Sequence, residues 1–240
     1  MNAEIDALLA RVGRRAADVP DAALLERIAN SLKPSLQPVK PVAASWMQAS
    51  GLVLICGAVA LVGARGGVQG LEKLTLPERI LIISTLGILT WVMARELVSS
   101  LSPGSRRYLT PGGLLALASF TLLTLFALLF HDYRFEHHAA AGVVCLRVGL
   151  SYAIPVAVLG WLLLRRGFAV NAASAGALWG ALAGLGGVGV VVLRCDNFQA
   201  LHILLWHVGV VPVCAAAGTA LGWLTARAPQ LFAMRSRWLR

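Results

Sequence analysis

Long runs of apolar residues, separated by short polar segments, dominate the chain from residue 46 onward. Each run holds 19 to 26 residues, and a helix needs about 20 to cross a hydrocarbon core of about 30 Å. A helix satisfies its backbone hydrogen bonds within one segment, as the bilayer requires. The pattern predicts six spanning helices, over residues 46–64, 80–101, 112–130, 139–164, 169–193 and 201–226. Arg95 and Glu96 interrupt the second run, and we expect it to leave the bilayer near them.

Composition supports the same class of protein. Hydrophobic residues make up 58% of the chain and charged residues 13%, whereas soluble domains hold roughly 45–50% and 25%. The sequence therefore predicts an all-α, polytopic membrane protein. It has no Cys-x-x-Cys pair, and its predicted spans are not lined with acids, Glu96 being the one acid within them, so we expect neither an enzyme nor catalytic residues.

Lysine and arginine are distributed unequally between the two ends of the predicted spans. The side that holds both termini carries 14 of them and the opposite side carries 5. Basic residues favour the cytoplasmic side, so we expect both termini in the cytoplasm. The net charge of +10 is then explained by this bias and by attraction to anionic lipid, and we expect no direct contact with nucleic acid. Three segments follow: a cytoplasmic segment 1–44, a membrane domain 45–226 and a basic cytoplasmic tail 227–240.

The N-terminal segment contains two short amphipathic patterns. Their apolar residues recur at helical spacing and are Ile5, Leu8, Leu9 and Val12, then Leu24, Leu25, Ile28 and Leu32. Neither predicted helix lies in the membrane, so each apolar stripe must be buried against another surface. One interpretation is a helix that lies on the lipid surface, and the other is a docking site for a soluble protein.

Polar residues gather in the loop between the third and fourth spans. His131, His137 and His138 lie there with two carboxylates, within eight residues. Together with a thiolate from Cys145 they are candidate ligands for a transition metal. The alternative is an ordinary polar loop at the depth of the lipid headgroups.

Cys145 and Cys195 lie near the outer ends of the fourth and fifth spans. Consecutive helices with a short link pack antiparallel, so we expect the two thiols to be near each other. Arg194, and Arg147 with it, would lower the pKa of these thiols and make them more reactive. The pair is a candidate sensor that forms a disulfide or binds a soft metal; the alternative is two small packing residues.

Other cysteines and histidines in the spans have a simpler expected role. Cys56 and Cys214 fall near the middle of the membrane, where we expect them to pack. His202 and His207 lie in the outer half of the sixth span, where we expect them to cap and pack that helix; the alternative is a proton relay. Glycines four residues apart, at Gly176 and Gly180 among others, predict a face where helices pack closely.

The second half of the chain carries a family resemblance. Its residues are Cys145, the turn Arg165-Arg166-Gly167, the run Arg194-Cys195-Asp196, then His202, Trp206, His207, Pro212, Gly218 and Gly222. In these features the chain resembles the negative-regulator-of-sigma-F family. Members are six-helix anti-sigma factors of the bacterial inner membrane.

The resemblance implies a function. The cytoplasmic face would hold an extracytoplasmic-function sigma factor until a metal or oxidative signal modifies Cys145 and Cys195. That the apolar stripes of residues 1–44 bind this partner is our inference from their amphipathic pattern and not part of the resemblance. The resemblance therefore implies no permanent cofactor. The ligand that it implies is a heavy-metal ion bound transiently by the two cysteines. The alternatives are a small metal or solute transporter with the histidine loop as its entry site, and a membrane scaffold with no signal.

Overall fold

The structure is a computed structural model of the chain that describes residues 22–32, 43–102, 109–133, 138–164, 169 and 171–238. Residues 1–42 and 43–240 form two compact units. The elements are α2 (Ala22–Leu32), α3 (Ser45–Ala64), α4 (Gln69–Glu72), α5 (Leu76–Leu101), α6 (Pro111–Leu129), α7 (His138–Leu164), α8 (Ala172–Arg194), α9 (Ala200–His202), a π-helical turn (η2, Ile203–His207) and α10 (Val210–Trp238). All are helical, which agrees with the predicted class.

Six helices are long and apolar enough to cross a membrane, and their number confirms the prediction. Their bounds are Ser45–Ala64, Leu76–Leu101, Pro111–Leu129, Ala140–Leu164, Ala172–Arg194 and Ala200–Arg227. The sixth span is composite, because α9 continues into the π turn and a two-residue turn, Val208 and Gly209, joins the π turn to α10. The chain is a multi-pass membrane protein.

The start of α5 shows how polar residues extend a span. The helix begins at Leu76, earlier than hydropathy alone predicts. The backbone N–H and the hydroxyl of Thr75 both donate to the Glu78 carboxylate, each at 2.7 Å, and this capping box satisfies groups that the first turn leaves unpaired. At its other end α5 continues past Glu96, which is buried, to Leu101.

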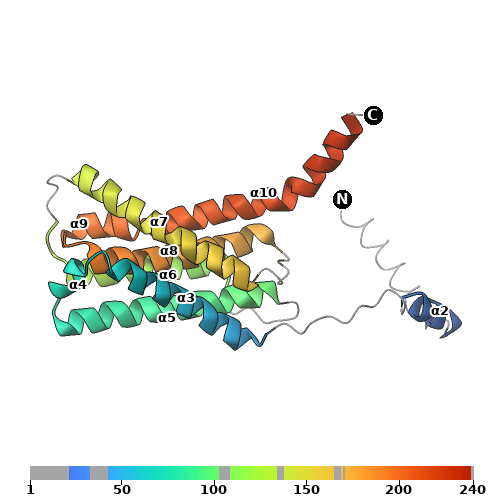
Figure 1. Cartoon of the computed structure of the whole chain (residues 1–240), viewed down its shortest axis with the longest axis horizontal. Coiled ribbons are helices and arrows are strands. Elements are labelled where there is room, and N and C mark those ends of the chain that lie inside the picture. Colours follow the sequence, from blue (N-terminus) through green and yellow to red (C-terminus); the bar gives the residue numbers. More distant parts are fainter. Residues whose placement is uncertain are drawn as a thin grey trace, which may run out of the picture. The chain divides into compact units, whose positions relative to one another are not determined.

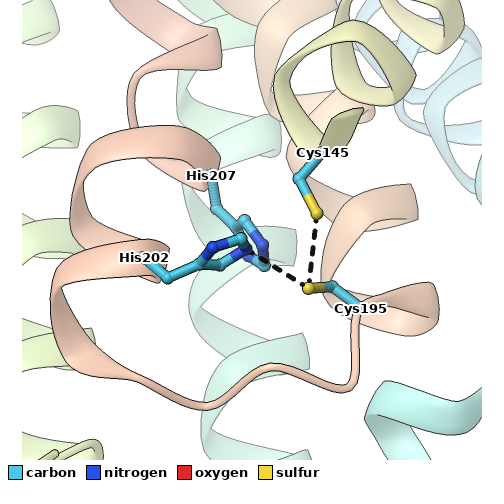
Figure 2. Close-up of side chains that lie close together, drawn as sticks. All are labelled: Cys145, Cys195, His202 and His207. Carbon is cyan, nitrogen blue, oxygen red and sulfur yellow. Dashed lines mark hydrogen bonds between the residues drawn. The ribbon is translucent and has the colours of Figure 1, made fainter. Parts of the chain in front are cut away.

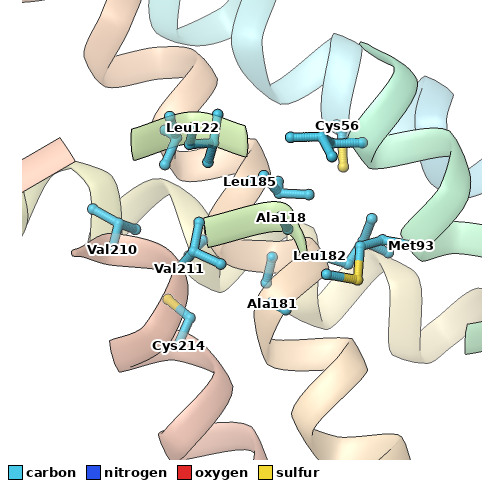
Figure 3. Close-up of a cluster of buried hydrophobic side chains, with 14 of the residues drawn as sticks. Cys56, Met93, Ala118, Leu122, Ala181, Leu182, Leu185, Val210, Val211 and Cys214 are labelled. Carbon is cyan, nitrogen blue, oxygen red and sulfur yellow. The ribbon is translucent and has the colours of Figure 1, made fainter. Parts of the chain in front are cut away.

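Helix α8 is the centre of the bundle. Of its apolar window 78% is buried, against 22–50% in the other five spans, so its neighbours rather than lipid surround it. It packs against α3, α5, α6, α7 and α10 (Figure 1). The apolar cluster around it includes Leu182 and Leu185, and Cys56 and Cys214 lie in the same cluster (Figure 3). Both cysteines are buried, as expected of packing residues.

Glycines bring α8 and α10 into backbone contact. A Cβ at Gly176 would overlap the carbonyl oxygen of Gly218, and one at Gly218 would overlap the carbonyl oxygen of Gly176. The same holds for Gly180 against the carbonyl of Cys214. The predicted close-packing face of the fifth span is therefore confirmed, with α10 as its partner.

Within the 43–240 unit, the spans alternate in direction. The start of α3 and the last part of α10 lie toward one end of the bundle, and α4, α9 and the start of α7 lie at the other (Figure 1). The unit of residues 1–42 contains α2, whose Leu25 and Ile28 side chains are exposed. The helix occurs where the second amphipathic pattern predicts one, and residues 5–12 lie outside the described part of the chain.

Candidate thiol and metal site

Two thiols that are fifty residues apart in the sequence lie in contact at one end of the bundle. Cys145 lies about two turns into α7, and Cys195 is the residue at which the chain leaves α8. The Cys195 N–H donates to the carbonyl of Val191 at 2.8 Å and completes the helix. Because α7 and α8 pack against each other, the two sulfur atoms come within 3.4 Å (Figure 2).

The α4 segment covers the chain beside Cys195. A Cβ at Gly70 would overlap the carbonyl oxygen of Cys195, so only glycine permits this approach. Next along the chain, the Asp196 carboxylate pairs with Lys73 Nζ at 3.2 Å. Both side chains of that pair are exposed, so the pair contributes at most about 1 kcal/mol, and the backbone packing of Gly70 is the stronger constraint.

Two imidazoles from the sixth span complete the cluster. His202 Nε2 is 3.5 Å from Cys195 Sγ, and the ring centroids of His202 and His207 are 5.2 Å apart. One ligand atom from each of Cys145, Cys195, His202 and His207 lies within 4.8 Å of the others (Figure 2). We call this set the thiol–imidazole cluster. Both histidines are completely or almost completely buried, whereas the cysteines are partly exposed.

Hydrogen bonding inside the cluster favours the thiolate form of Cys195. The bond donated by the Cys145 thiol lowers the pKa of Cys195, and the bond with the His202 ring acts in the same direction, while burial opposes both. Arginines are not the cause, contrary to the expectation from sequence. The Arg194 guanidinium packs against Gly66, and Arg147 is exposed.

The comparisons with known proteins identify the family. A sequence profile described as negative regulator of sigma F matches residues 28–227, which include all six spans and the cluster. The chain belongs to this family. No curated protein and no solved structure gives a significant match. The resemblance seen in the sequence is thus confirmed. The chain is a membrane protein, and its family is described as a negative regulator of a sigma factor.

In this family member, His131 is the one other candidate histidine from the sequence whose side chain the structure describes. His131 is exposed and is not part of the thiol–imidazole cluster. His137 lies outside the described residues, and His138 begins α7 with a side chain that is not described. Among the described residues, the histidines that lie close to the two thiols are therefore His202 and His207.

Sequence reasoning missed these two histidines because of their spacing. In a regular α-helix, residues five apart point about 140° away from each other, which argues against a shared site. The signal that was present is chemical: two imidazoles in the outer half of an apolar span are unusual, and polar residues inside the membrane are commonly functional.

The cluster can carry out two kinds of chemistry on the same sulfur atoms. A disulfide has an S–S bond of about 2.05 Å, so the sulfurs would have to approach by roughly 1.3 Å, and two electrons and two protons would leave to an oxidant. Alternatively, two thiolates and two imidazole nitrogens are a donor set that suits zinc or a related soft ion. One pair of thiols cannot do both at once.

Proposed function

We propose that this protein is a membrane-bound anti-sigma factor. It holds an extracytoplasmic-function sigma factor at the cytoplasmic face of the bacterial inner membrane, and it releases that factor when Cys145 and Cys195 react with a metal ion or an oxidant. It acts by binding rather than by catalysis, and it needs no cofactor to hold its partner. The observation that carries the proposal is the 3.4 Å contact between two thiols in a family of sigma-factor regulators.

Topology supports a signal that crosses the membrane. The thiol–imidazole cluster lies at the end of the bundle opposite the start of α3 and the last part of α10 (Figure 1). The excess of lysine and arginine toward the termini assigns that opposite end to the cytoplasm. The thiols then face the periplasm, which is an oxidising compartment.

The N-terminal segment supplies the surface for the partner. In α2, Leu25 and Ile28 are exposed on a helix that includes Leu24 and Leu32 in the same amphipathic pattern. An amphipathic helix of this kind fits an apolar groove on a soluble protein. We propose that this stripe, together with the one at Ile5, Leu8, Leu9 and Val12, contacts the sigma factor.

Helix α8 provides a route from one face to the other. It ends at the cluster, it runs the length of the bundle, and its neighbours enclose it. A closely packed core shifts between discrete arrangements rather than deforming smoothly. Coupling of about 1–3 kcal/mol changes partner affinity roughly 5- to 150-fold, and a nearly complete switch needs about 5.5 kcal/mol.

The experiment that tests this proposal is purification of the full-length protein from its own membranes in mild detergent. We expect a sigma factor to copurify, and removal of residues 1–44 to abolish that copurification while the bundle stays folded. Intact protein that brings no sigma factor would refute the proposal. Uptake of a metal or solute into liposomes by the same preparation would instead support a transporter.

Orientation needs a separate measurement. We expect membrane-impermeant maleimide, added to intact cells after removal of the outer membrane, to label Cys195. The same reagent should label it no faster after the inner membrane is opened. Labelling that occurs only in opened membranes would place the cluster on the cytoplasmic side and would contradict the proposed topology.

A further inference from the structure

The two buried histidines contain polar atoms that the protein leaves without partners. Among the described residues, His202 Nδ1 and both ring nitrogens of His207 have no hydrogen-bond partner. The remaining nitrogen, His202 Nε2, faces Cys195 Sγ. Burying a polar group without a partner is unfavourable, and native proteins leave few of them. Trp206 Nε1 in the same turn also lacks a partner. A metal ion takes one nitrogen from each imidazole, so it would supply the missing partner of one His207 ring nitrogen, while His202 would bind it through Nε2, the nitrogen that faces Cys195.

The π turn is the element that turns both rings to the same side. The Val208 N–H donates to the carbonyl of Ile203 at 3.1 Å, which is a bond between residues five apart. In this geometry residues five apart lie roughly one turn from each other, so His202 and His207 share a face that a regular α-helix would deny them. Single π turns within α-helices occur frequently at functional sites.

We propose that His202 and His207 are metal ligands, and that they complete with Cys145 and Cys195 a four-coordinate site for a divalent, thiophilic d¹⁰ cation of the zinc and cadmium class. This deepens the proposed function, on which it rests for its biological role, by naming the ligand set at the sensing thiols. The binding chemistry itself does not depend on the sigma factor.

The distances fit such a site. Zinc bonds of about 2.3 Å to sulfur and about 2.0 Å to nitrogen give tetrahedral edges of roughly 3.3–3.8 Å between ligand atoms. The cluster has 3.4 Å between its sulfurs and 3.5 Å between Cys195 Sγ and His202 Nε2. All four ligand atoms lie within 4.8 Å of one another, so a contraction of about 1 Å at the longest edges brings them to bonding positions.

Charge and enclosure also fit. A divalent cation with two thiolates and two neutral imidazoles has no net charge, which suits the end of an apolar bundle where an unpaired charge would be costly. The two imidazoles are buried, with His202 at 0% and His207 at 2% exposure, so the histidine side of the site is closed to solvent, as in structural rather than open catalytic metal sites.

Two measurements on the reduced, full-length protein in detergent, with no sigma factor present, test this ligand set. The first is X-ray absorption at the zinc edge after one equivalent of zinc is added. We expect two sulfur neighbours at about 2.3 Å and two nitrogen neighbours at about 2.0 Å. Coordination by sulfur alone, or by sulfur completed with water oxygen, would overturn the proposal, and this result does not depend on any variant.

The second measurement is a cadmium titration followed by the thiolate-to-cadmium charge-transfer band. His202→Ala and His207→Ala should each weaken cadmium binding by more than the roughly 10- to 100-fold that loss of an outer-shell partner causes. Leu205→Ala is the matched control, because Leu205 lies in the same π turn with its side chain exposed, and it should bind as the parent does. Unchanged affinity in both histidine variants would overturn the proposal.

The outcomes separate this inference from the proposed function. Four-ligand metal binding without copurification of a sigma factor would refute the proposed function and leave the ligand set standing. Copurification of a sigma factor with a sulfur-only metal site would do the reverse.

Discussion

The contact between α8 and α10 gives a prediction whose size follows from the structure. The perturbation is Gly180→Ala. A Cβ at this position would overlap the carbonyl oxygen of Cys214 and would lie 2.7 Å from the carbonyl carbon of the same residue. The atoms in the way are backbone, so no side chain can rotate to make room, and the helices must separate by about 1 Å to restore ordinary contact distances.

The expected free-energy cost combines two effects. Adding a methyl group to a closely packed core costs about 1–3 kcal/mol. Replacing glycine by alanine within a helix stabilises the folded protein by about 1 kcal/mol, because alanine has the higher helix propensity. Gly57→Ala in α3 is the matched control, because a Cβ there meets no atom within 4 Å and the variant has only the propensity gain. The free energy of unfolding should therefore differ between the two variants by about 1–3 kcal/mol.

The assay is unfolding of the purified protein by increasing mole fractions of SDS in mild detergent, followed by circular dichroism. We expect the Gly180→Ala transition at a lower SDS fraction than that of the parent, and the Gly57→Ala transition at the same or a higher fraction. Equal stability of the two variants would refute the reasoning that α8 and α10 depend on backbone contact. Since α8 ends at Cys195 and α10 follows His207, a weakened contact should also reduce the response of the cytoplasmic face to the thiols.

Two further predictions concern the cysteines. Because the Cys145 thiol and the His202 ring lower the pKa of Cys195, Cys195 should stay thiolate at pH values below the usual cysteine pKa of about 8.5. Its alkylation rate by iodoacetamide should therefore fall less between pH 8.5 and about 6.5 than that of a free thiol. Cys145→Ala, which removes the hydrogen-bond donor, should restore a steeper fall, whereas an ordinary pH profile in the parent would contradict the assignment. Cys56 is buried in the bundle, so it should react with iodoacetamide far more slowly than Cys195 in folded protein and at a similar rate after SDS unfolding; equal rates before unfolding would contradict the packing described for α3.

Hydropathy predicts the six spans because the bilayer imposes their length and composition. Their ends depend on interactions that hydropathy does not measure. The capping box between Thr75 and Glu78 lets α5 begin among polar residues. A prediction from hydropathy places the start of this helix later in the chain. Spacing of glycines likewise predicts a close-packing face on the fifth span, but it does not identify α10 as the helix that meets it.

The sequence predicts half of the candidate site. The antiparallel packing of consecutive helices predicts that Cys145 and Cys195 lie near each other, and the structure confirms this with a sulfur–sulfur distance of 3.4 Å. The histidines could not be assigned to the site from sequence. A π turn decides which way the His207 side chain points, and the residue types at 203–207 do not predict a π turn. The polar loop has the composition of a metal site, and of its three histidines the structure describes the side chain of His131, which is exposed and apart from the cluster.

The measurement that tests the central claim most directly is the amount of sigma factor that stays bound to the purified complex after cadmium or the thiol oxidant diamide is added. We expect the parent to lose its partner, with an affinity that falls roughly 5- to 150-fold for a coupling of about 1–3 kcal/mol. The Cys145→Ser, Cys195→Ser double variant should bind the sigma factor and keep it under both treatments. Release from the double variant to the same extent as from the parent would contradict the claim that these two thiols control the partner.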